Sequence, residues 1–315
     1  MQHFKVIKVS WNIKNKTNRL KTVIFVTTIL NDLIMSEQKE KYINPLTDFG
    51  FKKLFGTEST KVLLIDFLNQ ILPDRKIKDL SYSSNEKQGQ TEIDRKAIFD
   101  LYCIGDNGER FIVEMQKAKQ NWFKDRSVYY ASFPIQEQAK KNEWNYKLDP
   151  VYSIGILDFI FDDHKKEKEL LHIVELKNQH CEVFYNKLKF IYLELPKFKK
   201  KEKDLKTHFD KWIFVLTHLS KLQNRPKKLQ ERVFAKLFEE AEIAKFTPQE
   251  REAYEESLKY YRDIKNVVDT SREEGLKEGF EKRNFEIAKE MKNNGEPIEK
   301  IMKYTNLTRK EIENL

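Results

Sequence analysis

Three polar residues, Asp100, Glu114 and Gln116, interrupt apolar stretches of the chain, and their side-chain oxygens could hold a divalent cation. Glu114 and Gln116 are two positions apart in RFIVEMQ, so in a strand both side chains leave the same face, about 7 Å apart. Their neighbours Val113 and Met115 are apolar, so a charge at position 114 is unexpected in a buried strand. Hydrolysis of a phosphodiester needs such oxygen ligands to hold a Mg²⁺ that polarises the phosphate and activates water.

Whether Asp100 joins this pair depends on the register of the hairpin that its strand forms with RFIVEMQ. A two-residue Asn-Gly loop would pair Asp100 with Met115, whereas a three-residue DNG loop, with Gly108 in the left-handed conformation, pairs Asp100 with Glu114. Only the second register puts both acids on one face. We predict it, because an Asp inside AIFDLYCI is otherwise costly to bury. Spacing alone leaves open a polar edge hairpin whose acids face water.

The segments around this hairpin have the patterns of alternating helices and strands. Apolar residues at three- and four-residue steps between positions 48 and 72 predict two helical segments bent near Gly56. A further helix is predicted over residues 123–141. Strands are predicted over residues 92–104, 110–116, 151–159, 171–177 and 188–195. These elements predict an α/β core over residues 35–200.

The rest of the chain is predicted to be helical. The pattern turns to charge at FKKKEKDLK, where we place a domain boundary, and residues 201–265 then form a helical subdomain. Residues 266–315 form a charged helix and a small unit similar to a helix-turn-helix. Its residues Lys303, Arg309 and Lys310 could offer cations to DNA. The alternative is a solvated helical tail, or a cap through which copies of the chain form a homo-oligomer.

Residues 1–34 differ from everything after them. They are basic and lack a helical period, whereas the sequence from Met35 begins like an ordinary bacterial protein. We interpret residues 1–34 as a non-native or disordered extension, with a targeting segment as the alternative. The apolar run from Val23 to Leu30 is too short to span a bilayer, so no membrane partner is expected.

The composition favours a folded protein with a polyanionic partner. The 59 basic and 50 acidic residues leave a net charge of +9, which favours binding to a polyanion such as DNA. The two cysteines, Cys103 and Cys181, cannot build a disulfide framework and fit the reducing cytoplasm. The six histidines show no HxxxH or HExxH spacing, so no zinc site is predicted.

Several separated motifs resemble those of one known family, the PD-(D/E)XK family transposases, also called the Rpn recombination-promoting nucleases. The resemblance runs from about Asn44 to Phe198 and more loosely to the C-terminus. It rests, in chain order, on INPLTDFGFKKLFG, FDLYCIGDNGERFIVEMQ, RSVYYASFPIQEQ, YKLDPVYSIGILDF and FIYLELPKF. It implies a restriction-endonuclease-like α/β core, with a mixed central sheet flanked by helices, ahead of the all-helical C-terminal region.

The resemblance also implies roles for individual residues. Asp100 and Glu114 are expected to ligate Mg²⁺, for which Mn²⁺ could substitute. The superfamily usually has Lys two residues after its second acid. Here that position holds Gln116, whose neutral amide must orient the attacking water, and alternation places Lys117 on the other face, where it should not substitute.

Two further residues are weaker candidates. Asp48 stands where some superfamily members carry a helix carboxylate near the metal, although it could simply be the N-cap of its helix. Arg126 follows the active strand, where it could contact phosphate or be an exposed arginine bound to nothing.

The leading hypothesis is therefore a Mg²⁺-dependent endonuclease that cleaves double-stranded DNA in recombination or transposition-like events. One alternative is a catalytically weak DNA-binding or regulatory protein that keeps the nuclease fold. Another is an interaction protein whose C-terminal helices oligomerise. Cleavage of plasmid DNA separates the first hypothesis from the other two, and salt-dependent DNA binding separates those two from each other.

Overall fold

The computed structural model describes residues 40–72, 74–87, 97–139 and 145–315. The prediction for residues 1–34 and the start at Met35 lie outside the described residues. The helices are α2 (Asp48–Phe55), α3 (Lys61–Ile71), α4 (Phe123–Gln136), α5 (His208–His218), α6 (Arg232–Glu240), α7 (Pro248–Asn293), α8 (Ile298–Thr305) and α9 (Arg309–Glu313). The strands are β1 (Leu80–Tyr82), β2 (Glu86–Lys87), β3 (Ala97–Ile98), β4 (Leu101–Gly105), β5 (Arg110–Gln116), β6 (Val151–Leu157), β7 (Leu171–Lys177) and β8 (Val183–Glu194).

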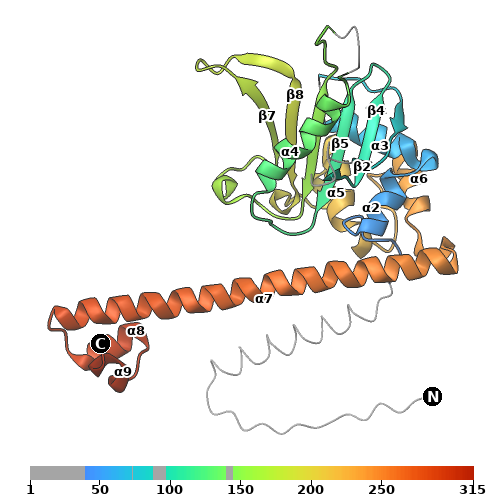
Figure 1. Cartoon of the computed structure of the whole chain (residues 1–315). Coiled ribbons are helices and arrows are strands. Elements are labelled where there is room, and N and C mark those ends of the chain that lie inside the picture. The colour runs from blue at the N-terminus through green and yellow to red at the C-terminus, as the bar shows by residue number, and fades with distance from the viewer. Residues whose placement is uncertain (1–39, 73, 88–96, 140–144) are drawn as a thin grey trace, which may run out of the picture.

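A mixed sheet of six strands forms the centre of the fold, in the order β1-β4-β5-β6-β8-β7 (Figure 1). Within this sheet β5, β6 and β8 run parallel to one another, and the remaining pairs are antiparallel. β2 and β3 form a separate two-stranded sheet. The predicted α/β core with a mixed sheet flanked by helices is confirmed.

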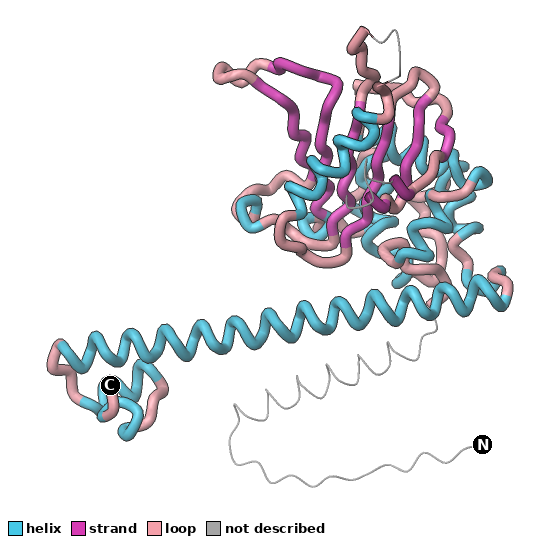
Figure 2. Tube along the Cα trace, viewed as in Figure 1, coloured by secondary structure: helices cyan, strands magenta, loops and turns pink. Residues whose placement is uncertain are grey.

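Helices cover both faces of the sheet, as Figure 2 shows. Phe111, Val113 and Met115 of β5 face the larger core, which also contains buried side chains of α2, α3, α5 and α6. Ile112 faces the opposite side, where α4 packs. Because side chains alternate along a strand, Glu114 and Gln116 lie on the α4 side with Ile112.

The helix α7 extends well beyond the core. Its first part packs on the core through Tyr254 and Tyr261, whereas exposed residues dominate its remaining length. α7 is 46 residues long and carries α8 and α9 at its far end (Figure 1). The division that we expected at residue 265 therefore falls inside one continuous helix. No helix in the described part of the chain is long and apolar enough to cross a bilayer.

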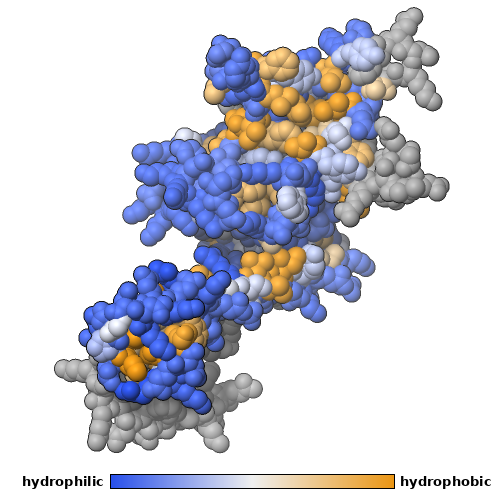
Figure 3. Space-filling model, turned by 60° about the vertical axis from the view of Figure 1, so that its left-hand side comes forward, coloured by the Kyte–Doolittle hydropathy of each residue, from blue (hydrophilic) through white to orange (hydrophobic). Residues whose placement is uncertain are grey.

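The end of α7 packs with α8 and α9 into a small C-terminal unit. Ala288, Ile301 and Ile312 form its buried centre. Figure 3 shows this unit as a largely hydrophilic surface around a small apolar patch. The described residues give this unit a core of its own at the far end of α7.

Candidate active site

The hairpin of β4 and β5 carries Asp100 and Glu114 to the same end of the sheet. Leu101 lies opposite Val113, and the two strands are joined by a three-residue loop. Gly108 in this loop has a φ of 83°, a conformation that glycine adopts without steric cost. The register predicted from the three-residue loop is confirmed, and it places Asp100, just before β4, across from Glu114.

Two hydrogen bonds tie the acidic side chains to the facing strand. The backbone N–H of Asp100 donates to Oε1 of Glu114 at 3.1 Å. The backbone N–H of Met115 donates to Oδ2 of Asp100 at 2.6 Å. The Glu114 side chain is only 13% exposed, and Asp100 is partly buried at the edge of a cleft.

Burial and mutual repulsion raise the pKa of both carboxyl groups. Burial raises the pKa of Glu114 to about 8, and the charge of Asp100 adds to the effect. Burial also raises the pKa of Asp100, against the hydrogen bond from Met115, and the charge of Asp48 raises it further. A cation compensates the charges of two such acids, and their hard oxygen atoms are the ligands that Mg²⁺ and Mn²⁺ prefer.

Arg126 of α4 reaches over the sheet to the third predicted residue, Gln116. Its Nη2 donates to Oε1 of Gln116 at 2.7 Å and lies 4.0 Å from Oε2 of Glu114. Its Nη1 donates to Gln120, and the guanidinium lies over the ring of Phe123. The interpretation of Arg126 as an exposed arginine bound to nothing is therefore wrong.

Gly155 of β6 allows α4 to come this close. In the parallel register Gly155 lies opposite Glu114. A Cβ at this position would lie 3.2 Å from atoms of both Leu157 and Tyr192, and 3.5 Å from the ring of Phe123. Because glycine has no side chain, the start of α4 packs directly on the strand and holds Arg126 beside the acidic pair.

Lys117 lines the same cleft as Asp100 and Gln116 and so lies near the site. Met115, which faces the larger core, lines this cleft too, so the expectation that Lys117 leaves the other face of the strand stays a prediction. The cleft has a volume of about 320 Å³, and Asp48 and Tyr260 also line it. Burial lowers the pKa of the half-buried Lys117, while the charges of Asp48 and Asp100 oppose that shift. The Lys117 ammonium lies 4.9 Å from the centre of the Tyr260 ring, on α7.

Lys117 and Tyr260 differ in how far the sequence could have indicated their place in the cleft. β5 ends at Gln116, so strand alternation cannot be extended to Lys117, and the polar run KAKQ marks that end. Tyr260 has no local signal, because it reaches the cleft from a helix that is distant in sequence.

Asp48 also lines the cleft, but it is not the N-cap of its helix. The N-cap of α2 is Thr47, whose side-chain oxygen accepts a hydrogen bond from the N–H of Gly50 at 3.0 Å. Asp48 is the first helical residue and forms an ion pair with Lys52, with 3.0 Å between Nζ and Oδ1. Its carboxylate could supply a further oxygen ligand beside Asp100.

The predicted DNA-binding cations of the C-terminal unit lie on its surface. Arg309 forms an ion pair with Glu299 of α8, and its Nη1 lies 3.9 Å from Glu313. Lys310 is exposed, and the Lys303 ammonium lies over the ring of Tyr304. Contact with DNA stays a prediction for all three cations, as does the homo-oligomer through the C-terminal helices.

Charge reversal in this unit should weaken DNA binding. With Arg309→Glu and Lys310→Glu together, we expect weaker binding to duplex DNA and a shallower salt dependence, by about 0.9 for each phosphate that is no longer neutralised. Fluorescence anisotropy of a labelled duplex over a salt series measures both quantities. Lys310→Glu alone is the cleaner variant, because it leaves the Arg309 ion pair intact. An unchanged salt slope in both variants would favour a solvated tail.

The fold and the site together define a class of protein: a mixed α/β sheet with paired acids on one hairpin, as in nucleases of restriction-endonuclease-like fold. The model of the PD-(D/E)XK nuclease family transposases matches residues 45–271, and the chain belongs to this family. Membership gives the chain a nuclease-like role, and nucleases of this kind typically use divalent metals. No curated protein and no solved structure matches the chain significantly.

Proposed function

We propose that this protein is a Mg²⁺-dependent endonuclease that cleaves double-stranded DNA in recombination or transposition-like events. The observation that carries the proposal is the partly buried pair of Asp100 and Glu114, since both groups have raised pKa values and both are held by hydrogen bonds. A divalent cation bound there would polarise the scissile phosphate and lower the pKa of the attacking water.

The remaining residues of the site position the reactants. The Gln116 amide is held at both ends, because its Oε1 accepts from Arg126 and its Nε2 donates to the carbonyl of Ala118 at 3.1 Å. An amide oxygen has two lone pairs and an amide nitrogen two hydrogens, so Gln116 keeps the capacity to orient a water molecule. Lys117 supplies the positive charge that the superfamily usually places at position 116.

A second cleft extends the site between α2 and α7. Its volume is about 690 Å³, and Asp48 and Tyr260 line both clefts. The DNA backbone could enter along this path and bring a phosphate to Asp100. The net charge of +9 supports binding of the polyanion through neutralisation of its phosphates.

Incubation of the purified protein with supercoiled plasmid tests the proposal. We expect nicked or linear product with Mg²⁺ or Mn²⁺ and none with EDTA. If no cation supports cleavage while the protein still binds DNA in a salt-dependent manner, the protein is a DNA-binding or regulatory member of its family instead.

The role of Lys117 gives a further prediction. Lys117→Met removes the ammonium but keeps much of the aliphatic side chain, so we expect cleavage to slow about 100-fold, or ~2.7 kcal/mol of transition-state stabilisation. The exposed Lys78 offers a matched control, and Lys78→Met should cleave at the rate of the unchanged protein. Equal rates for the two variants would exclude Lys117 from the reaction. Cleavage rates at saturating Mg²⁺ make the comparison.

A further inference from the structure

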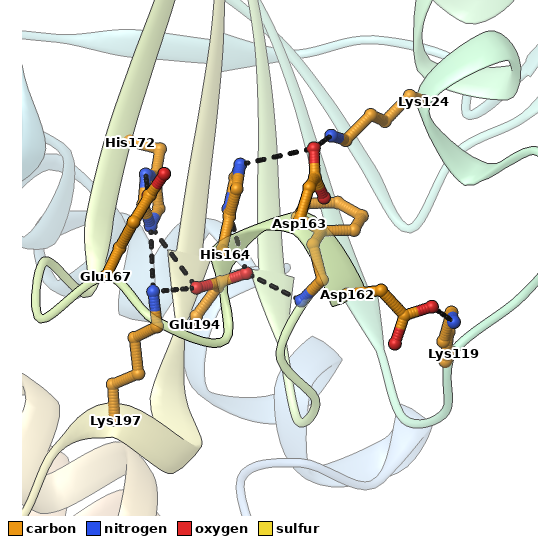
Figure 4. A network of polar contacts seen from close by, with 10 residues as sticks. Lys119, Lys124, Asp162, Asp163, His164, Glu167, His172, Glu194 and Lys197 are labelled. Carbon is orange, nitrogen blue, oxygen red and sulfur yellow. Dashed lines mark hydrogen bonds and ion pairs between the residues drawn. The ribbon is translucent and has the colours of Figure 1, made fainter.

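Two histidines and a glutamate from three separate elements meet in a second polar cluster (Figure 4). His164 ends a short 3₁₀ helix (Asp162–His164), His172 lies in β7, and Glu194 is the last residue of β8. One ligand atom of each lies within 4.8 Å of the others. The Glu194 side chain is fully buried, and the histidine side chains are 15% and 13% exposed.

The distances within the cluster suit a tetrahedral cation. Nδ1 of His164 lies 3.1 Å from Oε1 of Glu194, and Nε2 of His172 lies 3.2 Å from Oε2. Zinc binds nitrogen and oxygen at about 2.0–2.2 Å in tetrahedral geometry, which separates two ligand atoms by roughly 3.3–3.5 Å. The two imidazole rings are stacked, with centroids 4.1 Å and planes 26° apart. A metal lies in the plane of each imidazole that binds it, so the rings would have to turn to bring one carboxylate oxygen and both nitrogens into contact with one ion.

A carboxylate also faces the outer nitrogen of each histidine. Oε2 of Glu167 lies 3.5 Å from Nδ1 of His172, and Oδ2 of Asp163 lies 3.9 Å from Nε2 of His164. Histidines that ligate metals usually donate their other N–H to a carboxylate or carbonyl, which leaves the inner nitrogen free to bind the ion. The N–H of Phe161 similarly donates to Oε1 of Glu194 at 2.8 Å. At 3.5 and 3.9 Å the two carboxylates are too far to accept hydrogen bonds from the histidines, but they lie where an outer shell would form once the imidazoles turn toward an ion.

The ammonium of Lys197 already lies where a cation would be held. Its Nζ is 2.7 Å from Oε2 of Glu194 and 3.4 Å from Nε2 of His172. An ammonium can only donate, so Lys197 competes with the ring N–H of His172 for Oε2 of Glu194 and supplies there the positive charge that a cation would carry. Nζ also donates to the carbonyl of Glu169 at 2.8 Å, so Lys197 keeps one partner if it leaves Glu194.

We propose that His164, His172 and Glu194 form a Zn²⁺ site with one open position, and that Lys197 takes the place of the ion in the metal-free protein. Two imidazoles and a carboxylate are a zinc donor set, whereas Mg²⁺ prefers oxygen ligands alone. The segment that carries His164 also contacts elements of the candidate active site, because Asp163 pairs with Lys124 of α4 and Asp162 pairs with Lys119 after β5. Zinc binding would therefore hold the segment of Asp162 and Asp163 in place, and with it the contact to the start of α4.

Titration of ZnCl₂ into the full chain at neutral pH, followed by calorimetry, tests the site. The chain should carry Asp100→Asn and Glu114→Gln, so that zinc cannot bind at the acidic pair. We expect one Zn²⁺ per chain and a rise in melting temperature. His164→Ala or His172→Ala in this background should weaken binding at least about 100-fold, and Glu167→Gln about 10-fold. Lys197→Met should tighten binding, because it removes the competing ammonium.

The exposed His180 offers the matched control, and His180→Ala should bind zinc like its parent. No binding by the parent, or full binding after loss of both His164 and His172, would overturn the proposal. Co²⁺ provides a test without changes to the cluster, because tetrahedral Co²⁺ with imidazole ligands absorbs visible light strongly. A spectrum typical of octahedral Co²⁺ would contradict the site even if the alanine variants fail to fold.

Discussion

The metal-free protein should lose stability as the pH is raised from about 5 to about 8, because of Glu114. Its pKa is about 8 in the folded protein, against 4.5 for a glutamate in water. At acid pH the group is protonated in both states. Between these two values the unfolded chain ionises while the folded chain still holds its proton, so the free energy of unfolding falls as the pH rises. The loss is on the order of 3–5 kcal/mol, since each pKa unit is worth ~1.4 kcal/mol.

Urea denaturation in EDTA across this pH range measures the effect. Glu114→Gln should remove most of the pH dependence attributable to this group, and it should make the metal-free protein more stable at pH 8. Mg²⁺ should restore stability to the unchanged protein but not to the variant. The exposed Asp106 lies in the loop of the same hairpin, so Asp106→Asn should keep the full pH dependence. A Glu114→Gln protein with an unchanged slope would show that Glu114 does not hold a proton in the folded state.

Replacement of Asp100 should separate catalysis from folding. In Asp100→Asn the amide oxygen can still accept the N–H of Met115, but a neutral group holds Mg²⁺ poorly. We expect cleavage of supercoiled plasmid to slow at least about 1,000-fold, or ~4 kcal/mol of transition-state stabilisation. The metal-free variant should unfold at the same urea concentration as its parent or at a higher one, because a buried charge has been removed.

A structural acid would behave in the opposite way. Loss of such an acid leaves its hydrogen-bond partner poorly satisfied, at a cost of about 1–3 kcal/mol. Marked destabilisation of metal-free Asp100→Asn, with normal cleavage by the protein that remains folded, would identify Asp100 as structural. Asp106→Asn again provides the control, and its cleavage rate should equal that of the unchanged protein.

Local rules were sufficient to predict the hairpin that carries the candidate site. The DNG loop and the alternation of apolar residues in RFIVEMQ determine the register, because a shift by one residue would move every side chain of β5 to the other face. The helices α2 and α3 and the strand β6 follow from apolar periodicity in the same way. These features depend on neighbours in sequence, so the sequence contains the information needed to predict them.

Contacts between distant elements were not predictable in this way. The contact of Arg126 with Gln116 depends on how α4 packs on Gly155, and Tyr260 reaches the cleft only because of the path of α7. The cluster of His164, His172 and Glu194 has no linear metal-binding motif, since its ligands come from three elements. The boundary expected at residue 265 reflects a change in composition. It marks where α7 leaves the core, beyond Tyr261, and the helix continues.

The most direct test of the central claim compares the unchanged protein with Glu114→Gln on supercoiled plasmid, with Mg²⁺ and with EDTA. We predict nicked plasmid only from the unchanged protein with Mg²⁺, because only that sample has both carboxylates and the cation. Nicking by the Glu114→Gln protein at the rate of the unchanged protein, or equal nicking in EDTA, would contradict the assignment of Asp100 and Glu114 as the site of Mg²⁺-dependent cleavage.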